Sequence, residues 1–86
     1  MKIIMKEIEM IAYFECEGTP TPLKYRIEGE EGKHVVSVEK ILWHQEDKRA
    51  GNRMLTYLCQ SNFCGVMRQY ELRYETQSLK WFLYKM

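Results

Sequence analysis

The last third of the chain, residues 53–86, constrains the fold more than any other stretch. It contains three β-rich runs separated by short turns, which are 53–60, 66–75 and 80–86. In the second run, Tyr70, Leu72 and Tyr74 alternate with polar or charged residues. Alternation with a period of two places the three side chains on one face of a strand. Three such runs joined by short turns predict an antiparallel meander.

The first half of the chain shows the same alternation in three shorter segments. The strands expected there are 7–15, 23–28 and 34–38. In the first, the side with the charged residues consists of Glu7, Glu9, Ile11, Tyr13 and Glu15. In the second, we expect Leu23, Tyr25 and Ile27 to face inward. A hairpin turn at 30–33, with a glycine late in the loop, joins the second segment to the third.

Other stretches are expected to interrupt the strands. Residues 17–22 contain two prolines, each of which removes a backbone donor, so no central strand is expected there. Residues 1–6 are expected to be a frayed lead-in. The apolar parity then shifts by one residue after Val38. Because a shift of one turns every side chain to the other face, we expect a bulge near Glu39 or Lys40.

Residues 39–49 are the one segment where a helix competes with a strand. Its apolar start is followed by a polar run, which suits either a solvated helical turn or a long loop. We expect the strand to continue to about His44 and a loop to follow through Asn52, where a glycine and an asparagine end the segment.

The turn after Gln60 leaves two strand registers open. A type I turn over 62–65, with asparagine first and glycine fourth, would set Leu58 opposite Tyr70. A loop one residue longer would set Tyr57 opposite Tyr70 instead. Both pairings are chemically sensible, and the sequence does not separate them.

The length and composition of the chain favour a single small β domain, 1–86. Aromatic residues make up 13% of the chain, and alanine, the best helix former, occurs only twice. Short strands with tight turns in 86 residues predict a small barrel or a strongly curved sheet. We therefore expect an all-β antiparallel meander or barrel of five or six strands, SH3-like in size, with at most one short helix.

Several stretches together resemble a known group of proteins. They are 18–27, with its Pro-Leu-x-x-Arg-Ile strand, 38–42, 57–59, 70–75 and 80–83, with its Trp-x-Leu strand. Together they resemble a family of small, uncharacterised all-β proteins from Gram-positive, Clostridium-like anaerobic bacteria, over most of the chain. The resemblance implies a structural similarity and a loose association with genes for a DNA-repair polymerase. It implies no active residue, because the shared features are structural.

The charge of the chain is small in total and uneven in distribution. The net charge is +1, but residues 1–31 carry four Lys/Arg and seven Glu, and residues 32–86 carry nine Lys/Arg and five Asp/Glu. Small β-barrels bind single-stranded nucleic acid with cations that track phosphates and aromatic rings that stack on bases. The candidate binding face consists of Lys24, Arg26, Arg53, Arg73 and Lys80.

No catalytic or metal-binding motif is expected from the cysteines and histidines. Cys16, Cys59 and Cys64 lack the two close-spaced pairs of a structural zinc site, and neither His34 nor His44 has a partner at motif spacing. We expect reduced, metal-free thiols, no cofactor and solvent-exposed histidines. The chain shows no signal-peptide pattern and no apolar run long enough to span a membrane, so we expect a cytoplasmic protein that does not bind a membrane.

These features favour a non-enzymatic binding or accessory module. A protein partner, or a second copy, would meet an exposed strand edge or aromatic patch. Weak binding of single-stranded nucleic acid is the alternative, because affinity for phosphates depends on local positive charge. An enzyme with an unrecognised site is the second alternative. The net charge of +1 favours the protein partner.

Overall fold

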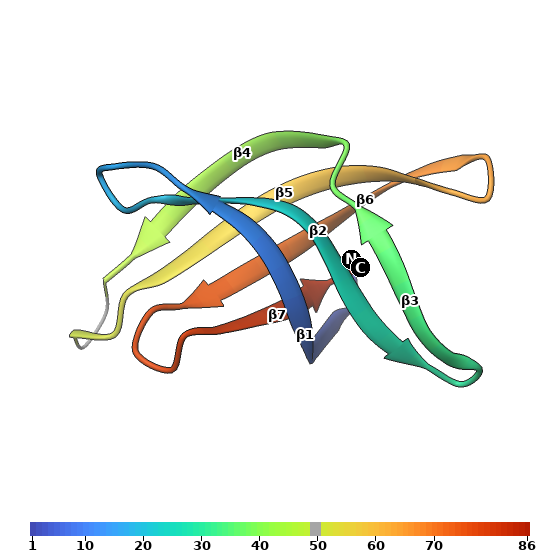
Figure 1. Cartoon of the computed structure of the whole chain (residues 1–86), viewed down its shortest axis with the longest axis horizontal. Coiled ribbons are helices and arrows are strands. Elements are labelled where there is room, and N and C mark those ends of the chain that lie inside the picture. The colour runs from blue at the N-terminus through green and yellow to red at the C-terminus, as the bar shows by residue number, and fades with distance from the viewer. Residues whose placement is uncertain (49–50) are drawn as a thin grey trace.

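The computed structural model describes residues 1–48 and 51–86 and shows one strongly curled antiparallel sheet (Figure 1). The described residues contain no α-helix, and therefore no helix that could cross a membrane. The strands are β1 (Ile3–Phe14), β2 (Pro20–Gly29), β3 (Gly32–Ser37), β4 (Lys40–Asp47), β5 (Met54–Phe63), β6 (Val66–Glu75) and β7 (Lys80–Lys85). The expected all-β antiparallel fold is confirmed, but the described strands number seven rather than five or six.

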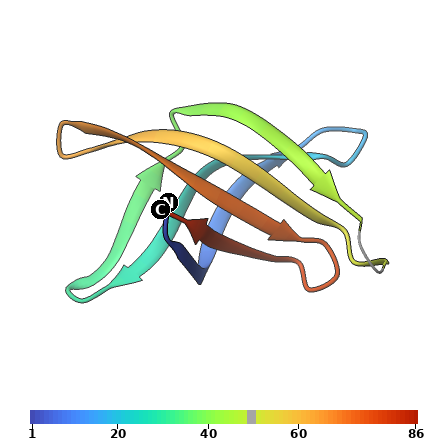
Figure 2. The same cartoon turned by 180° about the vertical axis from the view of Figure 1, so that it is seen from behind.

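The two ends of the chain meet in the middle of the sheet. The strand order is β3-β2-β1-β7-β6-β5-β4, so the first and last strands pair side by side (Figure 2). Lys2 and Met86 exchange two backbone hydrogen bonds, at 2.9 and 3.0 Å, and Ile3 lies opposite Lys85. The expectation of a frayed segment at 1–6 is therefore wrong for residues 2–6, which pairing with the end of the chain holds in place.

The extra strand arises at a corner between Val38 and Glu39. The backbone N–H of Val38 donates to the carbonyl of Leu23 on β2, at 2.8 Å, whereas that of Glu39 donates to the carbonyl of Gln60 on β5, at 3.1 Å. Two neighbouring residues therefore bond to opposite ends of the sheet. The one-residue shift in the apolar alternation, from which a bulge near Glu39 or Lys40 was predicted, falls at this corner. The corner divides the expected strand into β3 and β4.

β4 is longer than expected. It runs to Asp47 because Gln45 and Glu46 lie opposite Thr56 and Leu55 of β5, which gives their backbone groups ladder partners. A loop after His44 is therefore wrong for residues 45–47, and a helix is wrong for 40–47. The remaining part of the expected loop at 49–50 lies outside the described residues.

The prolines of β2 lie within a strand, contrary to expectation. Pro20 is the first residue of β2, and Pro22 lies opposite Ala12, where the register between β1 and β2 shifts. Both positions tolerate a missing N–H, because strand starts and bulges leave backbone groups outside the regular ladder. The same shift turns Leu23 outward, where its side chain is 46% exposed instead of facing inward.

The β5–β6 hairpin closes with a two-residue loop, Cys64 and Gly65. This loop sets Cys59 opposite Tyr70, so both registers expected from the sequence are wrong. The φ angles of the two loop residues are +52° and +86°. Positive φ at both central positions defines a type I′ turn, which matches the twist of the flanking strands. Asparagine or glycine is usual at the first position, and here a cysteine occupies it.

The core lies inside the curl of the sheet. Tyr70, Leu72 and Tyr74 share the inward face, as expected, and Trp81 and Leu83 are also buried there. The buried side chains around them include Ile8, Tyr25, Leu55, Tyr57 and Cys59. The rings of Tyr25 and Tyr70 meet edge to face with centroids 5.7 Å apart. This contact joins the β1–β3 half of the sheet to the β4–β7 half.

A buried chain of hydroxyl groups crosses the interior. The Tyr70 hydroxyl lies 2.6 Å from Ser61 Oγ. Ser61 donates to the carbonyl of Ser37, also at 2.6 Å. Since Ser61 has one proton, Tyr70 donates to Ser61. The chain links β6, β5 and the end of β3.

Loss of the Tyr70 hydroxyl tests the importance of this chain. Tyr70→Phe keeps the ring but removes the group that donates to the buried Ser61 hydroxyl, so we expect a loss of about 1–3 kcal/mol in the free energy of unfolding. Tyr13→Phe, which removes an exposed hydroxyl, is the control and should change it by less than about 0.5 kcal/mol. Urea unfolding measures both. Equal stability of the two variants would contradict the assignment.

The type I′ turn gives a second prediction. Asparagine adopts positive φ more readily than cysteine, so Cys64→Asn should raise the free energy of unfolding by about 0.5–1 kcal/mol. Cys16→Asn is the control, because Cys16 is also exposed but does not have a positive φ. A lower stability for Cys64→Asn than for Cys16→Asn in urea unfolding would count against the turn.

Candidate binding surfaces

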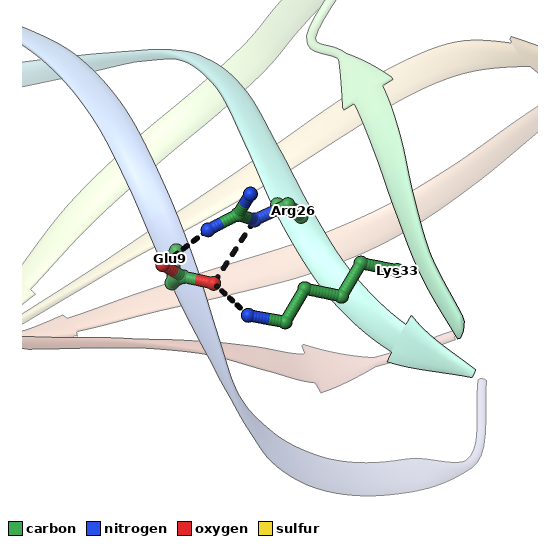
Figure 3. Close-up of polar contacts among 3 residues, drawn as sticks. All are labelled: Glu9, Arg26 and Lys33. Atoms are coloured by element: carbon green, nitrogen blue, oxygen red, sulfur yellow. Dashed lines mark hydrogen bonds and ion pairs between the residues drawn. The ribbon is translucent and has the colours of Figure 1, made fainter.

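The outer face of β1, β2 and β3 carries a cluster of three charged side chains (Figure 3). Arg26 on β2 donates from Nε and a terminal nitrogen to the two carboxylate oxygens of Glu9 on β1, at 3.0 and 2.8 Å. Lys33 on β3 donates to the same carboxylate at 3.2 Å. The sheet brings them together because Glu9 lies opposite Arg26. One carboxylate therefore holds two cations from two further strands.

The chemistry of Glu9 follows from these contacts. Hydrogen bonds from Arg26, and then from Lys33, lower the pKa of Glu9 from 4.5 to about 2. The group is fully exposed, so solvent screens the pair and its contribution to stability is small. Its main effect is local neutralisation: Arg26, a member of the expected binding face, already has an anion bound in bidentate geometry.

Two other members of the expected basic face are also paired. Lys80 on β7 lies 3.1 Å from the carboxylate of Glu7 on β1. Arg53, just before β5, donates to the carboxylate of Glu46 on β4 and lowers the pKa of that group. Each cation is therefore matched by a carboxylate on a neighbouring strand, which reduces the positive field available to a phosphate backbone.

The last two members of the expected face differ from each other. The guanidinium of Arg73 on β6 lies over the ring of Tyr84, 3.6 Å from its centroid, a cation–π contact. Lys24 on β2 forms no ion pair among the described residues. The five basic residues come from four separate regions, namely β2, the segment before β5, β6 and β7. The structure does not bring them together as one unneutralised face.

The three cysteines occupy three different environments. Cys59 is buried in the core, where burial raises the pKa of its thiol to about 12, so it is a poor nucleophile. Cys16 and Cys64 are exposed in turns, and all three are free thiols. Within residues 1–48 and 51–86, no group of three or more possible metal ligands occurs.

The two histidines are exposed, as expected. The ring of His44 packs against Tyr57 with centroids 5.7 Å apart, beside a cavity of about 260 Å³ that Glu15 and Glu17 also line. The proximity of Glu17 raises the pKa of Glu15. Within the described part of the structure, no hydrogen bond joins His44 to either carboxylate.

An apolar surface on the outer face of β1, β2 and β3 was missed in the sequence. Its exposed side chains are Ile11 (56%), Tyr13 (58%), Leu23 (46%) and Val35 (64%). A shallow hollow of about 460 Å³ is lined by Ile11 and Val35 together with Lys24 and Arg26. Ile11 and Tyr13 were readable as outward because they share one side of the strand with Glu7, Glu9 and Glu15, whereas Leu23 depended on the unforeseen register shift.

The two outer strands of the sheet have different edges. β4 has a register shift between Ile41 and Trp43, and its second half is strongly charged. β3 pairs with β2 without any shift, and it contains no proline. A groove of about 630 Å³ separates β3 from the end of β5, with both His34 and Cys64 at its rim but no hydrogen bond between them among the described contacts.

Comparison of the chain with protein-family models, curated proteins and solved structures found no match in any of the three. Functional interpretation therefore rests on the residues and geometry described above.

The Glu9 cluster makes a direct prediction for titration. The Glu9 carboxyl should titrate at about pH 2 in carboxyl-carbon NMR, and Arg26→Gln should raise its pKa because the largest cause of the shift is removed. Since the folded pKa is the lower one, the pairing stabilises the fold above about pH 4.3 and is lost as the pH falls towards 2. Arg53→Gln is the control and should leave Glu9 unchanged. Titration of wild-type Glu9 near 4.5 would refute the cluster.

Proposed function

We propose that the chain is a non-enzymatic binding module of the cytoplasm whose partner is another protein. The observation that supports this most is the exposed apolar surface on β1, β2 and β3, next to a strand edge that has no bulge and no proline. Isolated exposed apolar residues are ordinary, but a cluster beside a strand edge is typical of interaction surfaces. Reduced thiols in the cytoplasm agree with three free cysteines.

The charge arrangement supports a protein over nucleic acid. Binding to single strands needs cations that remain available for phosphates along a groove. Arg26, Arg53 and Lys80 are each bound to a carboxylate of this chain. A phosphate backbone would therefore have to displace three internal anions, whereas an apolar protein surface would leave them in place.

Site-specific photo-crosslinking tests this proposal. A p-benzoylphenylalanine in place of Tyr13 puts the reactive ring on the apolar surface, and one in place of Gln77, an exposed turn residue, is the matched control. Irradiation in cells of the native host should give a discrete protein adduct from position 13 and none from position 77. The double variant Ile11→Ser, Val35→Ser should abolish that adduct.

A fluorescence titration decides between this proposal and its alternative. Trp43 is 42% exposed and Trp81 only 7%, so Trp81→Phe leaves one surface reporter. Addition of single-stranded oligonucleotide at low salt should leave its emission unchanged. Salt-sensitive quenching that Arg73→Ala weakens, together with no adduct at position 13, would overturn the protein partner in favour of nucleic acid.

A further inference from the structure

The outer edge of β3 carries backbone groups that no strand pairs. The N–H of Val38 points to β2, because it donates to Leu23, and successive residues of a strand alternate in direction. The groups of His34 and Val36 therefore point to β2, and those of Lys33, Val35 and Ser37 point away from it. The hydrogen bond from Ser61 to the Ser37 carbonyl agrees with this direction. Lys33 and Val35 remain as the open part of the edge.

This edge lacks the features that protect strand edges in soluble proteins. Bulges, prolines and clustered charges all hinder the addition of another strand. β4, at the other end of the sheet, has a register shift at Leu42 and a charged second half. β3 has neither: its pairing with β2 is continuous from Gly32 to Ser37, and its single charged residue, Lys33, is held by Glu9.

The groove beside β3 has two walls. One wall is β3 itself with Ile27 behind it, and the other is the end of β5, where Phe63 and Cys64 lie. Val36 and Phe63 give the floor an apolar character. A second copy of the chain would bring β2 alongside its own β3, and the β5 wall stands in that path. A single extended segment, which has both faces free, fits between two walls.

Near the two ends of β3, the charged side chains that have neither an ion pair nor a hydrogen bond among the described residues have opposite signs. Glu30 and Glu31 form the turn before β3, and neither has an ion-pair partner in the described part of the chain. At the other end Glu39 lines the groove, and its carboxylate accepts a hydrogen bond from the backbone N–H of Asn62. Arg68 lies opposite Ser61 and so on the face of the hairpin that reaches Ser37. Arg68 likewise has no ion-pair partner among the described residues. A segment with a carboxylate at one end and a cation at the other complements both.

We propose that the edge of β3 binds an extended, β-branched segment of a partner protein as an added antiparallel strand. This inference rests on the proposed function and names the partner's chemistry. The groups of Val35 and Lys33 supply the main-chain hydrogen bonds, and alternate apolar side chains of the segment pack on Val36 and Phe63. Antiparallel addition places the acidic N-terminal end of the segment at Arg68 and its basic C-terminal end at Glu30 and Glu31.

The probe for this site is a synthetic peptide, acetyl-Glu-Val-Thr-Val-Thr-Val-Lys-amide. Its control is the same composition with the two charged residues exchanged, acetyl-Lys-Val-Thr-Val-Thr-Val-Glu-amide. Titration into ¹⁵N-labelled protein, followed by amide shifts, should perturb Lys33 and Val35 first. The first peptide should bind several times more tightly than the second, because only it matches both charged ends when antiparallel.

Two pairs of variants separate the edge from the surface beside it. Val35→Pro removes the outward N–H and should weaken binding at least about tenfold, whereas Val35→Ala keeps that N–H and should weaken it much less. Arg68→Gln should abolish the preference between the two peptides, whereas Lys24→Gln, a change outside the groove, should preserve it. Unchanged circular dichroism and thermal midpoint establish that each variant is folded.

Each other outcome overturns a defined part of the inference. Shifts at Ile11 and Tyr13 that Val35→Pro does not affect would move the interface to the outer face of the sheet. Concentration-dependent shifts at Lys33 without peptide, with a dimer in sedimentation, would make a second copy the occupant. No shift at millimolar peptide would refute the added strand. An adduct at position 13 in the crosslinking experiment would still support the protein partner, so the two proposals fail separately.

Discussion

The fold depends on a sheet closing without a complete backbone ladder. β3 and β4 are the two ends of one sheet, yet only two residues of chain lie between them. The hydroxyl chain from Tyr70 through Ser61 to Ser37 spans that junction inside the core. Burial raises the pKa of Tyr70, so its hydroxyl stays neutral and keeps the proton that it donates. At this junction, side-chain hydrogen bonds thus make the connection that main-chain pairing makes in a closed barrel.

The way the sheet closes also determines where it stays open. The Ser61 hydroxyl and the Glu39 N–H fasten the corner where β3 ends, and Tyr57 fastens the start of β2 by donating to the carbonyl of Pro20. These bonds hold only the Ser37 end of β3. Its other end pairs only with β2 and is otherwise held by the ion pair between Lys33 and Glu9 of β1, and a groove lies between β3 and the end of β5. The groove beside β3 and the hydrogen-bonded corner between β3 and β4 therefore follow from the same arrangement of strands.

Local alternation predicted the parts of the core that one strand can specify. Tyr70, Leu72 and Tyr74 share a face because they alternate, whatever their neighbours are. The corner at Val38 was not predictable, because a bulge and a change of sheet end produce the same one-residue shift. The β5–β6 register was missed for another reason: the turn uses Cys64 at positive φ, a residue type that carries no signal for such a turn.

The candidate surfaces were harder to predict because they depend on pairing across the sheet. The sequence alone assigns Arg26 and Lys80 to a set of basic residues, and it assigns Glu7 and Glu9 to a solvent-exposed face of the first strand. Pairing of β1 with β2 and β7 joins each cation to a carboxylate. The basic set then loses much of its positive field, and Arg68, outside the five residues expected from the sequence, remains unpaired among the described residues.

The difference between the two edges of the sheet gives a further reason to propose strand addition at β3. An exposed, regular strand edge risks aggregation, and natural sheets usually block it with bulges or charge. The edge strand β4 has both features, a register shift and a charged second half. At β3 the partial cover comes instead from the β5 wall, which limits access to a narrow segment and hinders the approach of another sheet. An edge that is shielded from self-association but open to a single strand is what selective strand addition requires.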